Sequence, residues 1–130
     1  MFIELNFKST IPIYEQLKNE IIIGIAKGEI SFGERLPSVR QLAGDIGINM
    51  HTVNKAYKQL EEEGFVSIHR QKGVVVNSEG PPTADKQYRL NLKTILKPMI
   101  ANAFCRDIEQ EEFVKIIEQI YVELEGRKNE

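Results

Sequence analysis

The sequence has one cysteine, two histidines and no long apolar run, and each of these features argues against a class of protein. Cys105 has no second cysteine in the chain, which excludes an intramolecular disulfide. No stretch approaches the roughly 18 consecutive apolar residues that a membrane span requires, and the N-terminal MFIELNFKST does not resemble a signal peptide. We therefore expect a cytoplasmic protein with no membrane partner.

The chain also lacks an excess of positive charge. It has 17 Lys and Arg against 19 Asp and Glu, a formal net charge of -2. Up to Ser78 the two signs balance at 9 each, and the remainder has 8 basic and 10 acidic residues. A uniformly basic nucleic-acid protein is excluded, but a local basic face is not, because phosphate contacts need only a handful of side chains per subunit.

Catalytic and metal-binding chemistry has little support in the sequence. Cys105 lies on the apolar face of a predicted helix, which favours a buried thiol over a nucleophile or redox sensor. Neither His51 nor His69 has a second metal ligand at a suitable spacing. We expect no enzyme activity, no metal and no cofactor.

Periodicity is clearest near the N-terminus, where apolar residues recur every four positions and predict an amphipathic helix over Pro12–Lys27. These residues are Ile13, Leu17, Ile21 and Ile25. Thr10 is the expected N-cap and Gly28 the expected stop. Glu29–Leu36 shows no periodicity, so we interpret it as a loop.

Two further helices follow, separated by a tight turn. Ser38 and Gln41 have the spacing of a capping box, in which each side chain bonds the other residue's backbone N–H. Gly47 suits the left-handed turn after this helix, and the third helix is expected to begin at Asn49 as N-cap and end at Glu63. Their predicted buried faces are Val39, Leu42, Ala43 and Ile46, then Val53, Ala56, Tyr57 and Leu60.

Beyond Gly64 the pattern changes to two short β-type runs, Phe65–His69 and Gly73–Asn77, typical of a hairpin. The predicted fold class is mainly α with a small β-hairpin wing: a winged helix-turn-helix followed by a short C-terminal helical dimerisation segment. Residues 1–78 form the predicted DNA-binding domain, 79–85 the linker and 86–130 the helical segment.

The C-terminal segment predicts two amphipathic helices, one over Lys86–Phe104 that Pro98 kinks and one ending near Gly126. Two helices of this size cannot bury a core alone, so a second copy of the chain is the expected partner. The predicted dimer contacts are Tyr88, Leu92, Ile95, Leu96, Met99, Phe113, Ile117 and Ile120. An alternative is a ligand cavity lined by Tyr88, Met99, Phe104 and Phe113.

In a helix-turn-helix, the first turns of the second helix face base edges in the major groove. Asn54 suits a bidentate contact to adenine, and basic side chains suit phosphate, although Lys55 and Lys58 are by default solubilising charges. The wing tip is expected to enter the minor groove or grip the backbone. The candidate DNA contacts are Arg40, Asn49, His51, Thr52, Asn54, Lys55, Lys58, Arg70, Gln71, Lys72 and Gly73.

The ordered motifs LPSVRQLA, GIN, TVNKAYKQLEEEGFV and a wing tip ending in KG before VVV resemble the GntR family of bacterial regulators, over roughly Ile11 to Asn77. TVNKAYKQLEEEG is similar to the YtrA-like branch, whose short helical tail replaces an effector domain. The resemblance implies DNA contacts at Arg40, at the start of the third helix and at the wing tip. Met50 and Asn54 stand where larger branches have Arg, so their base preference does not transfer.

The leading hypothesis is therefore a homodimeric repressor that binds double-stranded operator DNA at an inverted repeat. The resemblance further implies control of an ABC transporter operon, and the sequence names no small-molecule effector. The alternative is a winged-helix adaptor that binds proteins, motivated by the balanced total charge.

Overall fold

The computed structural model describes residues 3–126, and the predicted fold class is confirmed in them. Helices and one antiparallel hairpin follow in the order α1 (Ile13–Ala26), α2 (Val39–Ile46), α3 (Met50–Glu62), β1 (Val66–His69), β2 (Gly73–Val76), α4 (Lys86–Cys105) and α5 (Gln110–Glu125). The described residues form two compact units, 3–81 and 82–126.

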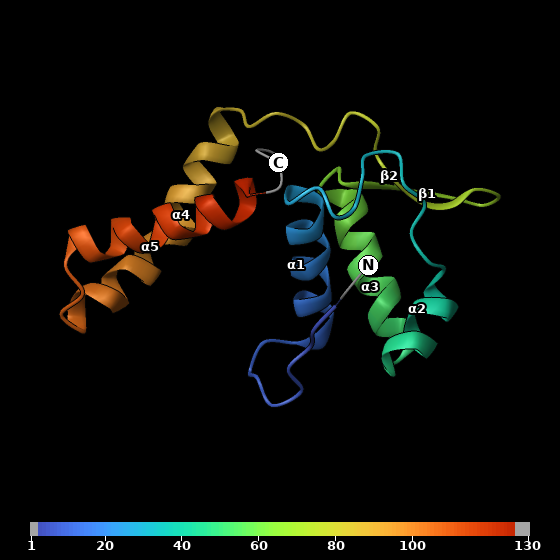
Figure 1. The fold of residues 1–130 in the computed structure, drawn as a ribbon, viewed down its shortest axis with the longest axis horizontal. Coiled ribbons are helices and arrows are strands. Elements are labelled where there is room, and N and C mark those ends of the chain that lie inside the picture. Colours follow the sequence, from blue (N-terminus) through green and yellow to red (C-terminus); the bar gives the residue numbers. More distant parts are fainter. Residues whose placement is uncertain (1–2, 127–130) are drawn as a thin grey trace. The chain divides into compact units, whose positions relative to one another are not determined.

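The core of the first unit is built around α3, which lies between α1 and α2 (Figure 1). Helix α3 has Val53, Ala56, Tyr57 and Leu60 on one face, and all four are fully buried. Removing this apolar surface from water stabilises the unit by about 25 cal/mol per Å2. The other buried residues are Leu17, Ile21, Ile25, Ile30, Leu36, Leu42, Ala43, Val66, Val74 and Val76.

Tyr57 also carries a polar group into this core. Its phenol donates a 2.7 Å hydrogen bond to the backbone carbonyl of Pro37, directly before the N-cap of α2. Burial raises the pKa of the Tyr57 phenol above its ordinary value, so the hydroxyl remains a donor. This bond joins the middle of α3 to the segment that starts α2.

The caps of α2 and α3 and the turn between them agree with the sequence, except for one half of the predicted capping box. Ser38 Oγ accepts from the backbone N–H of Gln41 at 3.1 Å, while the reciprocal bond from the Gln41 side chain is absent among the described residues. Gly47 adopts a φ of 70°. Asn49 caps α3, as expected.

The predicted N-cap of α1 is wrong. Pro12 occupies that position instead of Thr10, and no side chain caps the helix. The preceding loop is held by Gln16, whose side-chain amide accepts from the backbone N–H of Asn6 at 2.8 Å and donates to the carbonyls of Asn6 and Ile11. Proline needs no partner for a backbone N–H at this position, and Gln16 holds the chain that precedes it.

The segment interpreted as a loop before α2 instead joins the wing. Gly33 and Leu36 donate backbone hydrogen bonds to Val76 and Val74, and Val76 donates to Glu34, each at 2.8 Å. This segment therefore lies along the edge of β2 opposite β1, with Arg35 paired to Val75. Burial of Leu36 and the hydrogen-bonding capacity of the β2 edge explain why it is not a free loop.

The second unit has no buried residue in either helix. Helix α4 continues through Pro98 without interruption. Helices α4 and α5 do not pack closely against each other. The expectation of a buried Cys105 is wrong for the single chain, because Cys105 is exposed and none of residues 3–126 covers it. No helix within residues 3–126 is both long enough and apolar enough to cross a membrane.

We expect Tyr57→Phe to lower the free energy of unfolding by about 1 kcal/mol, because it deletes the hydrogen bond to Pro37 and leaves the ring in place. Urea denaturation followed by circular dichroism measures the change. Tyr121→Phe is the matched control, since Tyr121 is 60% exposed. Equal stability of both variants would contradict a role for the buried hydroxyl.

Candidate nucleic-acid interface

The face of α3 opposite its buried side is polar. His51 and Lys58 are exposed there, and Thr52 and Asn54 are half-buried on the two flanks. Because Val53 and Tyr57 are fixed in the core, this face has a fixed direction relative to the unit. The predicted candidates on α3 therefore share one surface, with hydrogen-bonding and cationic groups pointing outward.

Asn49 is the N-cap of α3 and lies at the start of this surface. Its Oδ1 accepts from the backbone N–H of His51 at 2.7 Å and caps α3. The carbonyl oxygen is therefore engaged, whereas the amide NH2 keeps its donors for another partner. Asn49 sets where α3 begins, and thus which residues lie in its first turn.

Lys55 is exposed, as Lys58 is, but its ammonium group contacts an aromatic ring of α1. Its Nζ lies 3.9 Å from the centre of the Tyr14 ring at the start of α1, a cation–π contact. The ammonium group is thereby drawn toward α1. Lys58, one turn further along α3, is exposed.

The remaining candidates lie on α2 and at the wing tip. Arg40 is the second residue of α2 and is exposed. Arg70, Gln71 and Lys72 form the exposed turn between β1 and β2, and Gly73 opens β2 with a φ of 75°. Figure 1 shows the hairpin extending outward from the first unit.

One basic residue near the wing was missed by sequence reasoning. A Cβ placed on Gly73 would lie 3.3 Å from Nε of Arg35, so the Arg35 guanidinium lies against Gly73. No periodicity marked Arg35, because its place depends on pairing with a strand about 40 residues later in the chain.

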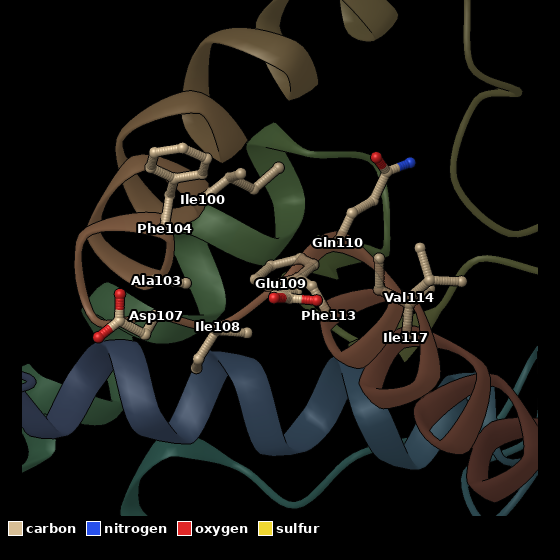
Figure 2. A pocket seen from close by; sticks show the side chains of 10 residues that line it. All are labelled: Ile100, Ala103, Phe104, Asp107, Ile108, Glu109, Gln110, Phe113, Val114 and Ile117. Atoms are coloured by element: carbon tan, nitrogen blue, oxygen red, sulfur yellow. The ribbon is translucent and has the colours of Figure 1, made fainter.

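The second unit contains an apolar groove of about 740 Å3 at the turn between α4 and α5 (Figure 2). Phe104 and Phe113 line this groove as expected, but Tyr88 and Met99 do not. The predicted cavity is therefore wrong for two of its four residues. Tyr88 lies at the start of α4, far along the helix from the turn, whereas Met99 precedes the groove residue Ile100 and points from another side of the helix. Within the described chain, no three His, Cys, Asp or Glu residues are arranged to hold a metal ion.

The predicted dimer contacts form an uncovered apolar surface on α4 and α5. Leu96 and Phe113 are half-buried, and the other six are exposed by 40% to 63%. Those six are Tyr88, Leu92, Ile95, Met99, Ile117 and Ile120. Several other large apolar side chains of these helices, including Phe104, are also exposed, so the second unit leaves much apolar surface uncovered by its described residues.

Three kinds of comparison relate the chain to known proteins. The family described as "Bacterial regulatory proteins, gntR family" matches residues 13–76, from the start of α1 to the end of β2. The HTH-type transcriptional repressor YtrA of Bacillus subtilis is 34% identical, with 97% of each chain covered. A Listeria monocytogenes structure described as a transcriptional antiterminator has a TM-score of 0.88 at 28% identity, covering 95% of this chain and 92% of that one.

A solved complex is also similar to the first unit. The DNA-binding domain of AraR bound to an operator has a TM-score of 0.52 at 27% identity, covering 58% of this chain and 98% of that chain. Its partner in that structure is operator DNA.

We expect Asn49→Ala to destabilise the protein by about 1 kcal/mol, because the first turn of α3 loses its cap. Asn49→Ser should stay close to wild type in stability, since serine also accepts the capping hydrogen bond. Urea denaturation of both variants measures the difference. If the alanine variant unfolds at the wild-type urea concentration, the cap is not what fixes α3.

Proposed function

Because this chain belongs to the GntR family of bacterial regulatory proteins, we propose that it is a homodimeric repressor that binds an inverted-repeat operator. It is a transcriptional regulator with an N-terminal DNA-binding domain, and its named relatives are regulators rather than enzymes. In this proposal residues 1–78 bind DNA, 79–85 form the linker and 86–130 pair two copies in the cytoplasm.

The observation that carries the proposal is the polar face of α3 on a rigid three-helix core. The operator complex of AraR supports the same use of this unit here. Asn54, half-buried on one flank of α3, is our candidate for a bidentate contact to adenine. His51 and the amide of Asn49 are candidates for further base or phosphate contacts, and Thr52 offers a hydroxyl on the other flank.

Basic side chains would anchor the unit without reading sequence. Arg40 and Lys58 are exposed and suit phosphate contacts on the two sides of the groove. Arg70, Gln71 and Lys72 at the wing tip suit the neighbouring minor groove, where Gly73 permits close approach. Lys55 contributes charge from its position over Tyr14.

The charges of α4 and α5 favour a second copy as the partner of the tail. Helix α4 has no carboxylate, whereas α5 has a single lysine, Lys115. The basic residues of α4 are Lys86, Arg89, Lys93 and Lys97, and the acidic residues of α5 are Glu111, Glu112, Glu118, Glu123 and Glu125. Opposite charges on two partner helices select orientation rather than adding much affinity.

These two helices do not pack closely along their length within one chain. We therefore place the apolar face of α4 against α5 of the second copy, and the reverse, as two-fold symmetry requires. Two DNA-binding units related by such an axis read two half-sites about one helical turn apart. The resemblance to the YtrA-like branch adds an ABC transporter operon as the regulated target.

The first experiment selects bound fragments from a randomised duplex library at about 150 mM salt, where purely electrostatic binding is weak. We expect an inverted repeat. Asn54→Ala should then weaken operator binding by about 5- to 150-fold and relax the preference at one base pair per half-site. Arg40→Ala should weaken binding to all sequences alike.

Lys115→Ala on α5 is the control for both variants, because it removes an exposed charge from the other unit. Unchanged operator affinity in both Asn54→Ala and Arg40→Ala would contradict the proposed reading surface. Weak, sequence-independent binding by the folded wild type would instead favour the protein-binding adaptor.

The dimer is tested by placing a charge on its proposed contact face. We expect Ile120→Glu to convert the protein to a monomer, because a carboxylate would be buried among apolar side chains. Val122→Glu is the matched control: Val122 is also exposed, at 69%, but lies on the opposite face of α5. Sedimentation equilibrium gives the masses, and a dimeric Ile120→Glu variant would place the interface elsewhere.

A further inference from the structure

The outer face of the wing contains a cation that no sequence motif indicated. Val74 and Val76 of β2 point into the core and are buried, so Gly73 and Val75 face outward. In the segment beside β2, Leu36 is buried and Arg35, which pairs with Val75, is exposed. Arg35 therefore lies on the outer face, beside β2.

Gly73 determines where the Arg35 guanidinium can lie. A Cβ at position 73 would be 3.3 Å from Nε, 3.4 Å from Nη2 and 3.7 Å from Cζ of Arg35. A side chain at position 73 would therefore crowd this planar group and require it to shift by a few tenths of an ångström. Gly73 thus serves two purposes, because its φ of 75° also shapes the turn at the wing tip.

The guanidinium keeps its hydrogen-bonding capacity in this position. Within residues 3–126, no carboxylate forms an ion pair with Arg35. The nearest acidic neighbour in the chain, Glu34, has its Oε1 accepting from the backbone N–H of Ser31 at 3.1 Å. Arg70 and Lys72 of the adjacent tip add positive charge to the same end of the wing.

We propose that Arg35 is a DNA-contacting residue, which binds a backbone phosphate beside the groove that the wing tip enters. Guanidinium groups bind phosphate through paired N–H donors, and a group held in one place loses less freedom on binding. Pairing with Val75 fixes the backbone of Arg35, and the guanidinium lies against Gly73. The assignment rests on the proposed operator binding and extends its contact surface from the tip residues to the neighbouring outer face of the wing.

The test compares Arg35→Gln, Arg35→Lys and Lys27→Gln on the selected operator over a range of salt concentrations. Arg35→Gln keeps much of the side-chain volume and removes the charge. It should weaken binding about tenfold at about 150 mM salt and reduce the slope of log K against log salt by about 1.8 for a dimer. Arg35→Lys should retain most of the slope. Lys27→Gln, at the end of α1, should match wild type.

Thermal denaturation of the same proteins separates contact from structural support. A lower melting temperature in Arg35→Gln with an unchanged salt slope would overturn the assignment, as would a slope equal to that of Lys27→Gln. If wild type itself shows no operator preference, the operator proposal fails, and the Arg35 assignment fails with it. A reduced slope at an unchanged melting temperature supports the phosphate contact.

Discussion

Burial of one face of α3 is the constraint on which the DNA-binding unit depends. Val53 and Leu60 lie in the core, and Tyr57 fills the space between them while bonding the carbonyl of Pro37. The same packing that stabilises the unit therefore fixes the rotation of α3 about its axis. A rotation of one residue, about 100°, would bury His51 or expose Tyr57, so the polar face can point only one way.

Local signals in the sequence predicted most of this unit because their partners lie within a few residues. Ser38 and Asn49 cap their helices through bonds to residues two or three positions away. Gly47 adopts a left-handed backbone conformation, which glycine allows whatever its neighbours are. Arg35 was missed because its pairing with Val75 is long-range. Thr10 was misassigned as a cap because the bonds from Gln16, six residues away, decide the path of that loop.

The tail shows a different limit of sequence reasoning. Periodicity predicted both helices and identified their apolar faces, since these properties belong to the segment itself. Whether a residue is buried depends on what packs against the helix, which the sequence of the helix does not reveal. Cys105 is therefore exposed in the single chain although its sequence neighbours are apolar. The sequence does separate the charges of the tail, with basic residues on α4 and acidic residues on α5, and this separation is the feature from which we argue for pairing of the two helices.

The balanced net charge of the chain is compatible with DNA binding because of where the carboxylates lie. Glu61 accepts a hydrogen bond from the backbone of β1, and Glu63 forms a 3.2 Å ion pair with Lys18, both at the C-terminal end of α3. With about 1.5 Å of rise per residue, this end is about 20 Å from Asn49. That separation exceeds the Debye length of about 8 Å at physiological salt, so these charges barely repel phosphates at the first turn. Position along one helix, rather than total charge, decides whether this surface attracts DNA.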